Sequence, residues 1–144
     1  MYVVLDASIA IKWFSSINEE HVENALAIQE KQVSGEINII VPDLFFLEVL
    51  NAFITSSQFS AEDILIIKDV LFKMSLEIKY PDDTMLTDSS KIAFEQDLTI
   101  YDSIYIAVAK SCDAILYTED KKILSCNKNY PFITDIKNLI WAYL

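Results

Sequence analysis

Short apolar runs alternate with longer segments of helical periodicity along the whole chain. Each run is only a few residues long and ends at a polar residue, a proline or a turn, which is typical of a buried strand. The expected strands are Tyr2–Leu5, Asn38–Val41, Leu76–Lys79, Ala114–Tyr117 and Phe132–Thr134.

The segments between these runs have apolar residues at helical spacing and polar residues that suit helix ends. Ser8 and Asp43 are expected to cap helices, Ser60 begins a pattern that resembles a capping box, and Gly35 ends a helix. The expected helices are Ile9–Phe14, Glu19–Ser34, Leu44–Thr55, a helix from Ser60 through Met74, Asp83–Phe94, Thr99–Ser111 and Asp120–Ser125.

Strands that alternate with helices imply a parallel sheet covered on both faces. We therefore predict an α/β fold, a three-layer α/β/α sandwich with a central, mainly parallel sheet. The chain has 144 residues and no linker or repeat, so residues 1–144 are expected to form a single domain. Ligands of such sheets collect at the carboxyl ends of the strands. Asp6 and Asp120 lie at or just beyond such ends.

Composition excludes several classes of enzyme. The only glycine is Gly35, whereas a Walker loop, a dinucleotide-binding turn and a nucleophile elbow each need at least two glycines. The net charge is −11 and all basic residues are lysines, which argues against non-specific binding of nucleic acid. A polyanion would have to be reached through a local cationic patch or through bound metal ions.

Other features place the chain in the cytoplasm. Cys112 and Cys126 match no zinc motif and are too few for a disulfide scaffold, so free thiols in a reducing compartment are expected. The first residues meet an acid too early for a signal peptide, and no apolar run is long enough to span a membrane.

Two acids occupy helical segments that are otherwise apolar. Glu48 lies in a segment that is apolar nearly all round, where a carboxylate is costly unless a positive group meets it. The alternatives are an exposed helix edge or a protonated Glu48 bonded to a carbonyl. Asp102 precedes a second apolar stretch, and for this residue judged alone, a position in the first helical turn after a Thr99 cap is the better explanation. Asp6 and Asp120 can also be simple caps.

Taken together, Asp6, Glu48, Asp102 and Asp120 can converge at one edge of the sheet. Clustered carboxylates repel one another, and no arginine is present to neutralise them. Such a cluster suits Mg²⁺ or Mn²⁺, which prefer carboxylate and water ligands. Metals held by acids promote hydrolysis of phosphate esters without a histidine or a serine nucleophile.

Four segments in order resemble the motifs of PIN-domain ribonucleases, and within that family those of VapC-type toxins. The similarity covers nearly the whole chain. The motif segments are Val4–Phe14, Pro42–Ala52, Leu98–Ala109 and Leu116–Asp120.

This resemblance implies a PIN-like fold and a metal-binding quartet of Asp6, Glu48, Asp102 and Asp120, which would also be the catalytic residues. It implies that the hydroxyls of Ser8 and Thr118 support these ligands. Family members cleave RNA with one or two Mg²⁺ or Mn²⁺ ions and commonly form homodimers. The toxins are inhibited by a small antitoxin protein that inserts a segment into the active-site groove.

One position departs from the family pattern. Many members carry a further acid two residues after the fourth-motif aspartate, where this chain has Lys122. This leaves open whether a second metal is bound. Lys12, Lys121 and Lys122 are candidates for contacts with RNA phosphates, although ordinary solvated surface explains Lys121 and Lys122 equally well.

Three alternatives compete with a ribonuclease toxin. A haloacid-dehalogenase-type phosphatase needs a second Asp where this chain has Ser8, so we set it aside. A PIN nuclease that processes RNA without being a toxin has the same residues. A PIN-fold binding module without catalysis would not need four intact acids.

Overall fold

The computed structural model describes residues 1–139, and every predicted strand and helix has a counterpart among them. The elements in chain order are β1 (Tyr2–Leu5), α1 (Ala7–Ile11), α2 (Val22–Val33), β2 (Asn38–Pro42), α3 (Leu44–Thr55), α4 (Ala61–Lys73), β3 (Glu77–Lys79), α5 (Asp83–Gln96), α6 (Ile100–Ser111), β4 (Ile115–Thr118), α7 (Lys121–Leu124), η1 (Ser125–Lys128), β5 (Ile133–Asp135) and η2 (Ile136–Asn138).

The five strands form one parallel sheet in the order β3-β2-β1-β4-β5. The central strand β1 pairs with β2 on one side and with β4 on the other, where Leu5 is opposite Tyr117. The chain builds the sheet in one direction from β1 to β3 and then returns to the other side for β4. The carboxyl ends of β1 and β4 therefore meet at the point where the strand order reverses, which is where ligands bind in open α/β sheets.

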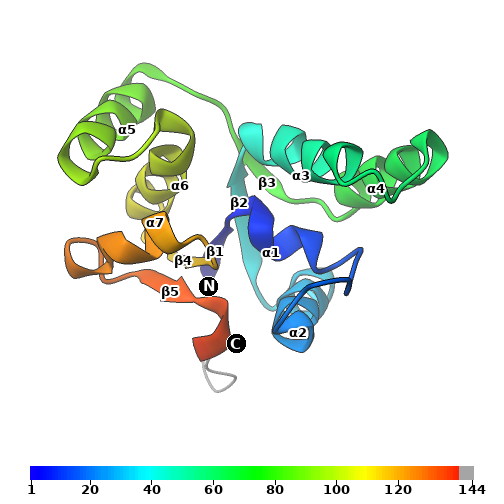
Figure 1. The fold of residues 1–144 in the computed structure, drawn as a ribbon. Helices are drawn as coiled ribbons and strands as arrows, with labels where there is room; N and C mark the ends of the chain where they lie inside the picture. Colours follow the sequence, from blue (N-terminus) through cyan, green and yellow to red (C-terminus); the bar gives the residue numbers. More distant parts are fainter. Residues whose placement is uncertain (140–144) are drawn as a thin grey trace.

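Helices cover both faces of the sheet, as expected for a three-layer sandwich. Helices α1 to α4 lie on one side of the strands, and α5 and α6 lie on the other (Figure 1). The core between the layers consists of the β-branched and apolar residues of the strands, with Val3, Val4 and Leu5 fully buried. Their burial on both faces agrees with the unbroken apolar runs in the sequence.

Two of the predicted caps differ from the structure. Helix α1 begins at Ala7, so Ser8 lies inside the helix, and its hydroxyl bonds Asp6. Asp43 precedes α3 but makes no side-chain cap hydrogen bond. The capping box of Ser60 and Asp63 is present at the start of α4.

Helix α3 is less buried than its composition predicts. Leu47 is 69% exposed and Ile54 is 59% exposed, while Phe45, Val49 and Phe53 face the core. An apolar surface therefore remains on the outer side of α3, and Glu48 lies at the boundary between the two sides.

Within residues 1–139, no helix has both the length and the hydrophobicity needed to cross a bilayer. Cys112 and Cys126 are free thiols, as expected. The terminal apolar segment Trp141–Leu144 lies outside the described residues.

Candidate active site

Asp6 directly follows β1 and is 7% exposed. Its Oδ2 accepts hydrogen bonds from the Ser8 hydroxyl at 2.8 Å and the Thr118 hydroxyl at 3.0 Å. Burial raises the pKa of Asp6, the two hydroxyl donors lower it, and the charge of Asp120 raises it again, with a net upward direction. The two hydroxyls predicted to support the acids therefore orient Asp6.

Asp120 follows β4 and is placed by the neighbouring backbone. Its Oδ1 accepts hydrogen bonds from the N–H groups of Lys122 at 2.8 Å and Ile123 at 3.1 Å. Its own N–H donates to the Thr118 hydroxyl at 2.9 Å. Asp120 is thus a helix cap, as the simpler interpretation predicted, and the same cap directs it toward the end of β1.

Glu48 reaches the site from the second turn of α3 and is half-buried. The Tyr105 hydroxyl donates to Glu48 Oε1 at 2.7 Å. Burial raises the pKa of Glu48, and the hydrogen bond from Tyr105 lowers it by less. The partner of Glu48 is a phenol and not the backbone carbonyl considered for it, and the side chain is half-buried at the edge of the apolar face of α3.

Asp102 lies in the first turn of α6, on the opposite face of the sheet from α3 (Figure 1). Its N–H donates to the Thr99 hydroxyl at 3.2 Å, so the predicted cap is present. Burial and the charge of Asp120 raise the pKa of Asp102, and Lys122 lowers it.

The four acids act on one another electrostatically. After burial, the charges of Asp6, Asp102 and Asp120 each raise the pKa of Glu48. Among the described residues, no lysine forms an ion pair with any of the four. Glu48 therefore lies within range of the charges of the other three acids, and the only positive charge that acts on the group among the described shifts is that of Lys122 on Asp102.

Carboxylates are ligands that divalent cations prefer, but the four acids are not all placed to hold one ion directly. In the part of the chain that the structure describes, no three His, Cys, Asp or Glu side chains are placed so that together they could hold a metal ion. Mg²⁺ usually binds through one or two carboxylates and keeps several waters. Asp6 and Asp120 follow adjacent strands and would suit that mode of binding, and the charges of Asp6, Asp102 and Asp120 all reach Glu48.

Lys12 does not face the solvent, so the expectation that it contacts RNA is wrong. Its side chain is 0% exposed, and its ammonium pairs with Glu19 at 2.6 Å and Glu119 at 2.8 Å. Burial lowers the pKa of Lys12, but its hydrogen bonds to Glu119 and Glu19 outweigh burial and raise it. The ammonium is held inside the protein and is not available to a phosphate.

Lys121 and Lys122 are exposed at the start of α7. Lys122 is close enough to lower the pKa of Asp102. Their contact with RNA stays a prediction.

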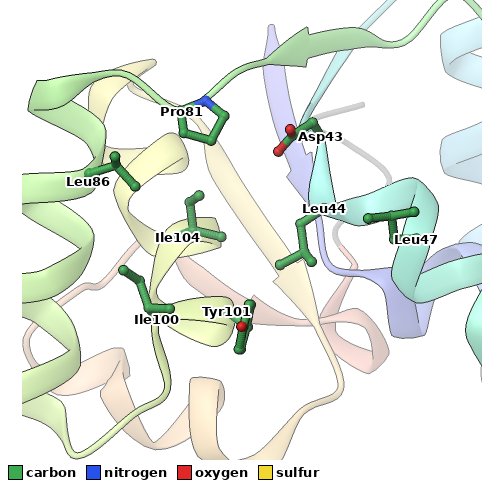
Figure 2. A pocket seen from close by; sticks show the side chains of 8 residues that line it. All are labelled: Asp43, Leu44, Leu47, Pro81, Leu86, Ile100, Tyr101 and Ile104. Atoms are coloured by element: carbon green, nitrogen blue, oxygen red, sulfur yellow. The ribbon is translucent and has the colours of Figure 1, made fainter.

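An apolar pocket of about 290 Å³ lies beside the acids, between the starts of α3 and α6. Figure 2 shows Leu44 and Leu47 of α3 across from Ile100, Tyr101 and Ile104 of α6. None of the four acids lines it. Its lining suits an apolar group and offers no cation to a phosphate.

Sequence reasoning missed the role of Tyr105, although its position contained a signal. Tyr105 is three residues after Asp102 on α6, so both lie on the same side of the helix. A phenol in an apolar helix is ordinarily read as core, and Tyr105 is indeed fully buried. Only its partner, Glu48 on another helix, shows that its hydroxyl serves the site.

Comparisons with known proteins agree with this geometry. The family model of the PIN domain matches residues 3–128. A search of curated proteins finds no significant match.

Solved structures share the fold at low sequence identity. VapC20 of Mycobacterium tuberculosis, a toxin that cleaves the sarcin-ricin loop, is 8% identical with a TM-score of 0.68, over 86% of this chain and 94% of that chain. A toxin–antitoxin complex from Klebsiella pneumoniae is 17% identical with a TM-score of 0.65, over 93% and 97%. PAE2754 of Pyrobaculum aerophilum is 22% identical with a TM-score of 0.64, over 94% and 89%.

Proposed function

This chain belongs to the PIN-domain family, and from that premise we propose that it is a metal-dependent endoribonuclease that hydrolyses RNA phosphodiester bonds. The observation that carries the proposal is the group formed by Asp6, Glu48, Asp102 and Asp120. These acids come from two strand ends and two helices, and the charge of Asp120 raises the pKa of each of the other three. None of the four forms an ion pair with a lysine among the described residues. Acids arranged in this way weaken the fold unless a cation binds them.

We propose that Asp6 and Asp120 bind Mg²⁺ or Mn²⁺ directly, and that Glu48 and Asp102 are ligands through waters of the ion. When bound, such an ion neutralises charge on a phosphodiester and lowers the pKa of an attacking water. Whether one ion or two is used is not part of the proposal.

The chain's own residues prepare the site before substrate arrives. Ser8 and Thr118 fix one oxygen of Asp6, which leaves the other directed away from them. Tyr105 does the same for Glu48. Side chains held in this way need no reordering when a ligand binds, which lowers the entropic cost of binding. The exposed Lys121 and Lys122 are candidates for contacts with the phosphates beyond the scissile bond.

We further propose that the protein is the toxin of a toxin–antitoxin pair. VapC20 is described as a toxin, and the structure from Klebsiella pneumoniae is described as a toxin–antitoxin complex. Exposed apolar residues of α3 and α4 other than Leu47 provide a surface for a small antitoxin: Ile54, Leu65, Ile66 and Phe72. The apolar pocket at the starts of α3 and α6 is where we place the contact with a second copy in a homodimer.

A PIN nuclease that processes RNA without an antitoxin would have the same site. An adjacent short reading frame that encodes a DNA-binding protein would favour the toxin. If expression of this chain arrested growth and co-expression of the neighbouring DNA-binding protein relieved the arrest, the toxin hypothesis would be supported directly.

RNA cleavage tests the proposed reaction. The purified chain is incubated with single-stranded and structured RNAs in Mn²⁺, Mg²⁺ or chelator, together with Asp6→Asn and Asp102→Asn. We expect cleavage that needs the metal and falls by at least about 100-fold in either variant, because each loses a charged ligand.

The matched control is Asp83→Asn, which makes the same change at an exposed acid outside the site. It should cleave like the parent. Cleavage in chelator, or full activity of Asp6→Asn with an intact fold, would contradict the assignment.

A further inference from the structure

Lys12 immediately follows α1, and all three N–H donors of its ammonium have acceptors. They are Glu19 Oε2 at 2.6 Å, Glu119 Oε2 at 2.8 Å and the Glu20 carbonyl oxygen at 2.6 Å. A buried ammonium is stable only when it is paired and hydrogen-bonded. The Lys12 side chain is therefore held in one position by its three acceptors.

The acceptors belong to two different segments. Glu19 and Glu20 lie in the loop between α1 and α2, whereas Glu119 lies in the turn between β4 and α7. That turn places Glu119 between Thr118 and Asp120, and the Glu119 N–H is 3.4 Å from the Ser8 hydroxyl oxygen. Lys12 thus joins the helix that follows Asp6 to the turn that contains Asp120.

We propose that Lys12 is a positioning residue for the acid group: through Glu119 it fixes the β4–α7 turn so that Asp120 stays beside Asp6 and both can bind one divalent cation. Lys12 touches neither the cation nor RNA in this role. The inference rests on the proposed function, because it takes the acids to be cation ligands.

A role of Lys12 in positioning and a purely electrostatic role predict opposite changes in cation affinity when Lys12 is replaced. Lys12→Met keeps a long side chain but takes a positive charge away from an acidic site. By Coulomb's law this should tighten cation binding. If Lys12 holds Asp120 in place, the same change should weaken binding, by about tenfold or more, as for other residues that orient metal ligands.

The two carboxylate partners of Lys12 provide a matched pair of variants. Their side chains are similarly exposed, at 22% for Glu19 and 28% for Glu119. Glu19→Gln and Glu119→Gln each remove one charged partner of the same ammonium, so both should lose stability to a similar degree. Only Glu119→Gln releases the turn that contains Asp120, so only this variant should lose about tenfold in affinity for Mn²⁺.

The experiment is calorimetric titration of Mn²⁺ into the parent chain and the three variants, with folding checked by circular dichroism. Titration is repeated at about 1 M salt, where the Debye length is about 3 Å, so that the charge of Glu119 itself contributes little. Weaker binding by Lys12→Met, and by Glu119→Gln relative to Glu19→Gln at both salt concentrations, is the expected result.

Equal or tighter binding by Lys12→Met would overturn the inference, as would equal affinities of the two glutamine variants. If Lys12→Met does not fold, the glutamine pair decides alone. A parent chain that binds no Mn²⁺ would refute the proposed function itself. A parent chain that binds Mn²⁺ and cleaves RNA, with unaffected variants, would refute only the role of Lys12.

Discussion

The surroundings of Asp6 shift its pKa in opposite directions. Burial raises its pKa, and the hydroxyls of Ser8 and Thr118 lower it, yet the net direction is upward. When folding raises the pKa of a carboxyl group, its ionised form is less stable in the folded chain than in the unfolded chain. Without a cation, Asp6 therefore weakens the fold at neutral pH, and a bound cation would offset this loss.

The same reasoning gives Glu48 a definite dependence on pH. Its pKa in the folded chain lies above its ordinary value, mainly because of burial. The folded state therefore binds the proton more tightly than the unfolded state. The stability of the metal-free protein should fall as pH rises through the interval between the unfolded and the folded pKa values of Glu48.

Glu48→Gln tests this prediction. Glutamine keeps an oxygen that can accept the hydrogen bond from the Tyr105 hydroxyl, but it has no charge that burial would desolvate. In chelator at pH 7, the variant should melt a few degrees above the parent. The advantage should disappear as pH is lowered, because a proton on Glu48 then removes the same charge. Thermal melts from pH 7 to pH 4 measure the difference in melting temperature between the variant and the parent. A variant that melts well below the parent at pH 7 would show that Glu48 stabilises the fold as an anion.

At the scale of elements, two helices begin with a hydroxyl cap and an acid three residues later. Ser60 accepts from the N–H of Asp63 at 3.1 Å, and Thr99 accepts from the N–H of Asp102 at 3.2 Å. The cap of α4 is remote from the acids, whereas the cap of α6 fixes the turn that contains Asp102. One local motif therefore serves stability alone in α4 and both stability and the site in α6.

Replacing each cap with alanine separates these roles. Ser60→Ala and Thr99→Ala should each lower the free energy of unfolding by about 1 kcal/mol, because each leaves a helix N–H without its acceptor. Only Thr99→Ala should also lower Mn²⁺-dependent RNA cleavage, by several-fold, since Asp102 then lies in a frayed turn. Urea denaturation and initial cleavage rates measure the two effects. Equal cleavage by both variants would show that the cap of α6 does not serve Asp102.

The elements themselves were largely predictable, because hydrophobic periodicity and caps are local signals. Helix α3 matched its predicted bounds from Leu44 to Thr55. Its burial did not match, since Leu47 and Ile54 remain exposed. Periodicity reports which residues are apolar, and an apolar surface left for another molecule has the same pattern as a core.

At the scale of the whole molecule, the strand-end rule places Asp6 and Asp120 after adjacent strands, and the charge of Asp120 reaches Asp6. The position of Tyr105 three residues after Asp102 was a weak signal of its role, but the partners of Tyr105 and Lys12 are far away in the sequence and could not be predicted. A lysine is almost never buried, so Lys12 was expected at the surface. Its burial depends on Glu119, which the fold brings from the other end of the chain.

The chain has a net charge of −11, and the proposed function requires its acidic site to admit RNA. Few phosphate contacts from lysine are available near the acids, with Lys121 and Lys122 the nearest along the chain. The account therefore assigns the approach of the substrate to the bound cation more than to a basic surface. Everything depends on whether the four acids bind that cation.

Thermal melting with and without Mn²⁺ tests this point most directly. The variants are Asp6→Asn combined with Asp102→Asn, and Asp83→Asn as the control with the same substitution elsewhere. At about 100 times the dissociation constant, a cation specific to the folded state stabilises it by about 2.7 kcal/mol. Mn²⁺ should therefore raise the melting temperature of the parent and the control by several degrees and leave the double variant unchanged. No shift in the parent, or an equal shift in the double variant, would contradict the account.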